Sequence, residues 1–131
     1  MERYVAFEES FRTWLSRACA EPIPPTVKAF SFNIFEYPET PTVKFGVELI
    51  GASSFDSANP DWACDEVWEP SIRRLEIPTS FSSRAWEDCL ARTEVLVHDC
   101  LESPPLAQFL KQGEAVGIGF VDGGLSLIWR R

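Results

Sequence analysis

The side chains of this 131-residue chain that could do chemistry are its carboxylates, its four cysteines and its single histidine. The histidine, His98, is followed by Asp99 and Cys100, and these are the residue types of a nucleophilic catalytic site. Successive residues on a helix are turned by about 100°, so three adjacent side chains point to different sides and cannot meet at one substrate atom. We therefore expect no catalytic residues here, and His98 to be a surface or half-buried structural residue.

The most unusual segment lies between Lys44 and Arg73, where six carboxylates occur without any basic residue and alternate with aromatic residues. Disordered tails lack aromatics, and carboxylates resist burial in a core. The segment is therefore typical of a recognition surface, in which a tryptophan anchors the partner and carboxylates attract it. The candidate partner-binding residues are Glu48, Asp56, Asp61, Trp62, Asp65, Glu66, Trp68 and Glu69. The alternative is a solvated acidic loop with Trp62 or Trp68 packed beneath it.

The same residues do not match a standard metal site. After Asp56, alanine and proline stand where a calcium loop needs ligands, and its glycine is absent. The cysteines, at positions 19, 64, 89 and 100, contain no CxxC pair and no zinc-ligand spacing. We predict reduced thiols, no metal and no cofactor. A site that combines Cys64 with Asp65 and Glu66 stays open as an alternative.

Charge narrows the class of partner. The chain has a formal net charge of -8 and a pI near 4.6. Residues 1–69 hold 12 acidic and 5 basic side chains, whereas residues 70–131 hold 8 and 7. Nucleic acids and anionic membranes attract clustered Lys and Arg, so neither is expected as a direct partner. A basic protein fits better, although acidity for solubility alone is an equal alternative.

Length and hydropathy predict one globular domain over residues 1–131. No run reaches the roughly 18 apolar residues of a membrane span. The amino terminus, Met1 to Tyr4, lacks the basic and apolar regions of a signal peptide. We therefore expect a cytoplasmic protein.

The elements that must position these residues can be predicted from periodicity. Apolar residues at three- and four-residue intervals predict an amphipathic helix over residues 4–18, beginning with Val5 and ended by the prolines from Pro22 onward. Residues 27–37 and 42–50 predict a hairpin. In its second strand one face is apolar, and the other, with Lys44, Gly46 and Glu48, is expected to be wet.

The second half predicts a strand over 72–77, a helix from residue 82 or 83 to about 102, a short helix over 106–111, and a terminal hairpin over 115–121 and 124–130. The Asp122-Gly123 pair favours a type I′ turn, and Gly117 and Gly119 are expected to clear space for Trp86 or Trp14. The apolar stripe of the long helix is Trp86, Leu90, Thr93, Val97, Cys100 and Leu101. This order of elements predicts an α+β fold with a mostly antiparallel sheet, on which the N-terminal helix and the long central helix pack.

Two strings in the chain carry a resemblance to a known family. The chain resembles small bacterial proteins encoded beside Rhs-type and other polymorphic toxins in two strings: FGVELIGASSFDSANPDWACDEVWEP, which begins at Phe45, and EAVGIGFVDGGLSLIW near the end. Those proteins are thought to be immunity proteins. The resemblance implies a non-enzymatic antitoxin that binds a cognate toxin domain and holds it inactive.

The leading hypothesis is thus an immunity protein whose acidic surface binds a basic toxin domain. Two hypotheses from other classes remain. One is a small enzyme that works through Cys64, Asp65 and Glu66 in the Trp-lined acidic loop 55–69. The other is a ligand-binding or adaptor domain that uses the same loop or the wet face of the sheet, marked by an apolar cavity.

Overall fold

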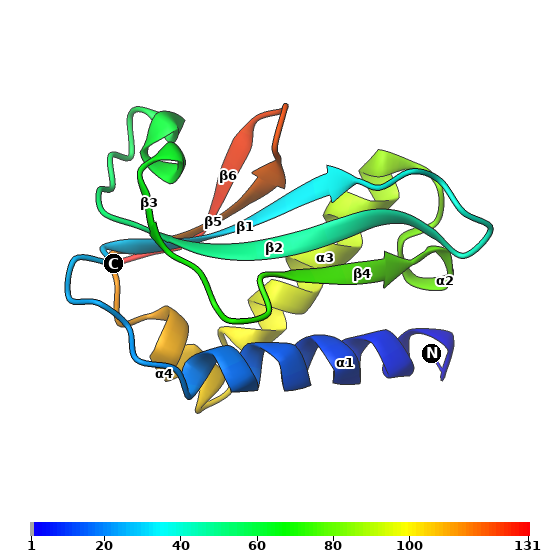
Figure 1. The fold of residues 1–131 in the computed structure, drawn as a ribbon, viewed down its shortest axis with the longest axis horizontal. Helices are drawn as coiled ribbons and strands as arrows, with labels where there is room; N and C mark the ends of the chain where they lie inside the picture. Colours follow the sequence, from blue (N-terminus) through cyan, green and yellow to red (C-terminus); the bar gives the residue numbers. More distant parts are fainter. Residues whose placement is uncertain (1) are drawn as a thin grey trace.

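The structure is a computed structural model that describes residues 2–131, with side chains from residue 6 onward. The helices and strands form an α+β fold, in which runs of strands and runs of helices follow one another along the chain (Figure 1). The elements are α1 (Glu2–Cys19), β1 (Ala29–Glu36), β2 (Val43–Ala52), the 3-10 helix η1 (Pro60–Cys64), β3 (Glu66–Trp68), β4 (Arg74–Pro78), α2 (Thr79–Ser82), α3 (Trp86–Cys100), α4 (Leu106–Leu110), β5 (Ala115–Phe120) and β6 (Leu125–Arg130).

The strands form one six-stranded sheet in the order β3-β2-β1-β5-β6, and β4 also pairs with β2. Strands β1 and β2 form the predicted hairpin, with Phe32 opposite Leu49, and β5 and β6 form the second. The β1–β5 pair is parallel, while the other pairs are antiparallel. The predicted fold class is therefore confirmed.

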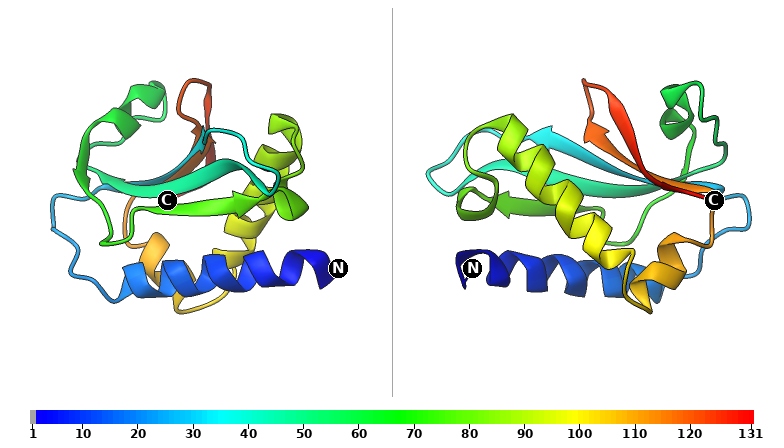
Figure 2. Two further views of the ribbon diagram at one scale, coloured as in Figure 1. Left: turned by 45° about the vertical axis from the view of Figure 1, so that its right-hand side comes forward. Right: turned by 180° about the vertical axis from the view of Figure 1, so that it is seen from behind.

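The long helices pack on one face of the sheet. In Figure 1, α1 runs along the lower side, and Figure 2 shows α3 crossing the same face diagonally. Alternate residues of the central strands point into this layer, because side chains of a strand alternate between faces. They include Phe30, Phe32 and Ile34 of β1 and Phe45, Val47 and Leu49 of β2, which meet Phe7, Phe11, Trp14 and Leu15 of α1. The predicted stripe of the first helix is confirmed except at Val5, whose side chain lies outside the described residues.

The predicted long helix is interrupted at its beginning. Residues 79–82 form the separate turn α2, Ser83 has a left-handed φ of 56°, and α3 begins only at Trp86. The Ser83 hydroxyl accepts from the amide of Ala85 and donates to Asp88, which fixes the entry into α3. The stripe predicted from Trp86 was incomplete, because Cys89 and Leu96 also point into the core.

The terminal hairpin has a different turn from the one expected. No glycine in residues 2–131 has a positive φ, so the type I′ turn at Asp122-Gly123 was a wrong prediction. Instead, the amide of Gly123 donates to the carbonyl of Phe120 at 3.0 Å, and four residues connect the strands.

None of the helices in the described range combines the length and apolar composition needed to cross a bilayer.

Candidate functional site

The two tryptophans of the acidic segment are packing residues. Trp62, on η1, is only 4% exposed and covers the sheet face opposite the long helices, together with Ala29, Ile50 and Ala52. Its ring lies 3.1 Å from where a Cβ of Gly117 would be. Gly117 therefore makes room for Trp62, not for Trp86 or Trp14 as expected.

Trp68 is half-buried at the end of β3 and packs on the main core. Its ring meets Phe30 and Phe109 edge to face, with centroids 6.0 and 6.3 Å apart. The packing of both rings therefore agrees with the alternative of a solvated acidic loop with tryptophans packed beneath it. Trp62 offers almost no surface to a partner, and Trp68 offers only part of its ring.

Glu48 is the centre of a polar network and does not lie on a wet strand face. The residue is 6% exposed, and its carboxylate accepts from Asn33 at 3.1 Å, from Arg73 at 3.1 and 3.2 Å and from Arg74 at 3.3 Å. Asn33 in turn accepts from the hydroxyl of Ser31 at 2.7 Å. The expected wet side of β2 was wrong here, because two arginines cover the carboxylate.

The electrostatics of this network keep Glu48 ionised. Burial raises the pKa of Glu48, but hydrogen bonds from Arg73 and Asn33 and the charge of Arg73 outweigh it, so the pKa is lowered overall. Hydrogen bonds to Glu66 and Glu48 raise the pKa of the Arg73 guanidinium. These groups hold one another in place within the fold.

Two further acidic candidates belong to the same network. Arg73 donates to both carboxylate oxygens of Glu66, one of them at 2.9 Å, and lies 3.5 Å from Glu69. Asp65 accepts from the hydroxyl of Ser54 at 2.6 Å. The part of the acidic segment around η1 is therefore more open than the part that bonds to Arg73.

Asp56 and Asp61 project from that side. Asp56 is exposed and accepts from the amide of Ala58 at 2.9 Å. Asp61 is exposed in the first turn of η1 and makes no ion pair in the described part of the chain. The structure therefore separates the eight candidates: Glu48, Glu66 and Glu69 are paired, Trp62 and Trp68 are packed, and Asp56, Asp61 and Asp65 face solvent.

A depression of about 320 Å³ lies between η1 and the β5–β6 turn, and we call it the loop pocket. Asp61 and Cys64 come from η1, Asn33 from β1, and Val121 and Gly123 from the turn. It is an open, mixed polar and apolar surface over the sheet. Of the eight partner-binding candidates only Asp61 lines it, and Cys64 lines it without Asp65 and Glu66, the other two residues of the alternative site.

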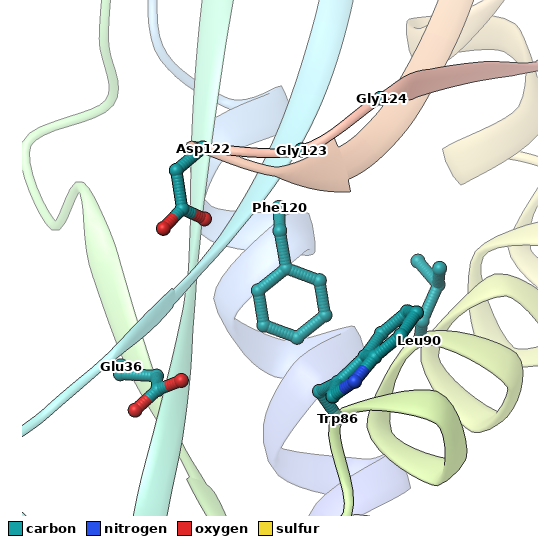
Figure 3. Close-up of a pocket in the computed structure, with 7 residues that line it drawn as sticks. All are labelled: Glu36, Trp86, Leu90, Phe120, Asp122, Gly123 and Gly124. Carbon is teal, nitrogen blue, oxygen red and sulfur yellow. The ribbon is translucent and has the colours of Figure 1, made fainter.

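A second depression of about 320 Å³ lies on the other side of the β5–β6 turn, and we call it the aromatic pocket (Figure 3). Its lining residues are Glu36, Trp86, Leu90, Phe120, Asp122, Gly123 and Gly124. Trp86 is 53% exposed, and its ring meets Phe120 at 5.9 Å and 89°. In the view of Figure 3, the carboxylates of Asp122 and Glu36 lie on the opposite side of Phe120 from Trp86.

Sequence reasoning missed the aromatic pocket. Trp86 was assigned to the buried stripe of the long helix, because its spacing from Thr93 and Val97 fits that stripe. It is the first residue of α3, however, where its ring packs edge to face on Phe120 and stays about half exposed. The signal in the sequence that could have indicated the pocket was a large aromatic residue at the first position of a helix.

The other reactive side chains do not converge. His98 is exposed and lies 3.6 Å from Glu102, while Cys100 is buried in the core. Burial raises the pKa of the Cys100 thiol to about 11 and that of Cys89 to about 12. Cys64 is exposed, but no cluster of three His, Cys, Asp or Glu side chains that could hold a metal occurs in the described residues.

Comparison of the chain with known protein families, with curated proteins and with solved structures found no match in any of the three.

Proposed function

We propose that this chain is a cytoplasmic immunity protein that binds a cognate polymorphic toxin domain through an acidic surface and holds it inactive. Sequence resemblance to immunity proteins encoded beside Rhs-type toxins motivates the proposal. The net charge of -8 favours a basic protein as the partner, and neither nucleic acid nor membrane is expected to bind directly. The protein would carry out no reaction of its own.

The observation that carries the proposal is the distribution of carboxylates without ion pairs around the β5–β6 turn. Asp61 lies on its η1 side, in the loop pocket, and Asp122 and Glu36 line the aromatic pocket on its other side. None of the three forms a salt bridge with any of the side chains described, those of residues 6–131. Unpaired acidic side chains beside apolar surface suit a protein interface, because they raise the association rate with a basic partner.

A small enzyme built on Cys64, Asp65 and Glu66 has less support. Glu66 is held by Arg73, and Asp65 is bonded to Ser54, so both carboxylates are committed to contacts within the fold. A ligand-binding role keeps one supporting observation, the two open pockets on either side of the β5–β6 turn.

The test is binding to the carboxy-terminal domain encoded by the adjacent upstream gene, measured by calorimetry at rising salt. We expect tight binding that weakens with salt. The double variant Asp56→Lys/Asp61→Lys should weaken it, because charge reversal on the exposed η1 segment repels a basic domain. The matched control is Glu9→Lys/Asp99→Lys, which changes the net charge equally but alters exposed residues of α1 and α3.

The outcomes separate cleanly. Weaker binding of the η1 variant with unchanged binding of the control supports an interface on this surface. Equal loss in both would point to net charge alone, and no binding by the wild-type protein would remove the antitoxin proposal. Thermal unfolding of each variant shows whether a loss reflects misfolding.

A further inference from the structure

The aromatic pocket is a pre-formed site. The edge-to-face contact with Phe120 holds the ring of Trp86 upright, and Leu90, one turn later on α3, supports it from behind (Figure 3). Phe120 is itself fixed by an edge contact with Phe45, at 5.6 Å, in the main core. A partner would therefore meet an ordered aromatic surface and would lose little entropy in ordering it.

The charge around these rings is negative. Glu36 ends β1 and Asp122 lies in the β5–β6 turn, and both side chains are exposed. Two cations of neighbouring segments are bonded elsewhere: Lys44 donates to the Arg84 carbonyl at 2.9 Å, and Arg84 donates to Glu39 and to the carbonyls of Thr40 and Pro41. Neither Glu36 nor Asp122 forms an ion pair among the side chains described, so the pocket combines aromatic faces with unpaired carboxylates.

Of the basic side chains, arginine fits this combination better than lysine. A guanidinium group is planar and weakly hydrated, stacks on aromatic faces and forms paired hydrogen bonds with carboxylates. A group entering over Phe120 would have Trp86 on one side and Asp122 and Glu36 on the other. An apolar side chain would leave two carboxylates facing it, and an acidic one would be repelled. Tryptophan and arginine are also enriched among the residues that dominate binding energy in interfaces.

We infer that the aromatic pocket receives an arginine side chain of the partner protein and is the anchor of the acidic interface. This inference rests on the proposed function, because it names a contact within that interaction. The arginine would stack against Trp86, while Glu36 and Asp122 would accept its N–H groups.

The first test uses the same upstream-encoded domain. Trp86→Ala should weaken binding about 30-fold, the loss typical of an interface hot spot. Glu36→Gln/Asp122→Asn should weaken binding and flatten its dependence on salt, because the variant removes two charges that salt would screen. The matched control is Val95→Ala: Val95 is 61% exposed on the same helix, nine residues later and half a turn round, and its loss should change nothing.

The second test needs no toxin. The ¹⁵N-labelled protein is titrated with N-acetyl-arginine methylamide at millimolar concentration and, in parallel, with the citrulline derivative, which has the same shape without the charge. The indole signal of Trp86, identified by its loss in Trp86→Phe, and the amides of Gly123 and Gly124 should shift with arginine and much less with citrulline. Equal or absent shifts would overturn the pocket.

The two tests fail in different ways. If the upstream-encoded domain binds the wild type and Trp86→Ala equally, the arginine anchor is wrong while the immunity proposal stands. If the arginine derivative shifts Trp86 but the domain does not bind at all, the chemistry of the pocket stands and the immunity proposal is wrong. Both readings require that Trp86→Ala still unfolds cooperatively and loses no more than about 1 kcal/mol of unfolding free energy, so that a loss of binding does not reflect misfolding.

Discussion

Trp62 and Trp86 illustrate two opposite uses of the same side chain. Trp62 lies in the acidic segment that looked most like a recognition surface, yet it is buried over Gly117 in a small core. Trp86 lies on a stripe that looked like a helix core, yet half of it is exposed beside two carboxylates. The neighbours of each tryptophan in the sequence therefore did not predict its role. Its neighbours in the folded structure determine whether the ring is buried or exposed.

The physical difference lies in what each ring finds beneath it. Small residues of β1, β2 and β5 form a flat bed under Trp62, including Ala29, Ala52 and Gly117. Under Trp86 lie Phe120 and Leu90, which are large and leave the ring protruding. A surface tryptophan with exposed neighbouring carboxylates is available for binding, whereas a tryptophan on a bed of small residues contributes to stability.

The largest expected effect tests the buried half of this comparison. Trp62→Ala should lower the free energy of unfolding by about 3–5 kcal/mol, because it removes a large ring and leaves a cavity over the sheet. Urea unfolding followed by circular dichroism measures the loss. Trp62→Phe, which keeps an aromatic ring, is the matched variant and should lose clearly less. A loss below about 1 kcal/mol for Trp62→Ala would show that the η1 segment is not packed as described.

The next effect concerns Glu48, the buried carboxylate of the acidic segment. Glu48→Gln should cost about 2 kcal/mol at neutral pH, because Arg73 and Arg74 lose a charged partner in a largely buried site. Glu36→Gln, at an exposed carboxylate, is the control and should change stability by less than about 0.5 kcal/mol.

Wild type and Glu48→Gln should also differ in how their free energy of unfolding depends on pH. The folded-state pKa of Glu48 lies below its ordinary value of 4.5, so its contribution is present above that pH and is lost as the pH falls through the folded pKa. The difference between wild type and Glu48→Gln should be constant from about pH 5 to about pH 8 and shrink at lower pH. Urea unfolding over this range is the measurement, and a difference that grew in acid would contradict the assignment.

Much of the fold was predictable because its apolar patterns are long. The stripe of α1 and the alternation in β1 and β2 each repeat several times, so they determine which face is buried. In η1 and β3 the elements are only five and three residues long, and their acidic residues can face solvent with either orientation of the tryptophans. The sequence therefore left the burial of Trp62 and Trp68 open.

The candidate site was harder to predict because it joins distant segments. Glu36, Trp86 and Asp122 come from β1, α3 and the β5–β6 turn, and only the parallel β1–β5 pairing and the crossing of α3 bring them together. Periodicity places a residue on a face but does not show where a helix extends past a sheet. The pairing of Arg73 with Glu48, 25 residues earlier in the chain, was hidden for the same reason.

A smaller effect tests the turn that separates the two pockets. A Cβ at Gly119 would overlap the carbonyl oxygen of Gly124, so Gly119→Ala must displace backbone and should cost about 1–2 kcal/mol. Gly124→Ala is the matched control: a Cβ there meets nothing within 4 Å, and its φ is not positive. Thermal unfolding compares the two, and equal stability of both variants would contradict the turn geometry.

The smallest expected effect completes the comparison. Trp86→Ala should lower the free energy of unfolding by about 1 kcal/mol or less, because it removes one edge-to-face contact and a half-exposed ring. The measurement is the same urea titration used for Trp62→Ala, which makes the two rings directly comparable. A loss above about 2 kcal/mol would place Trp86 among the packing residues. A small loss, joined to a large loss of binding, would mean that this chain keeps Trp86 at the surface for a partner rather than for its own stability.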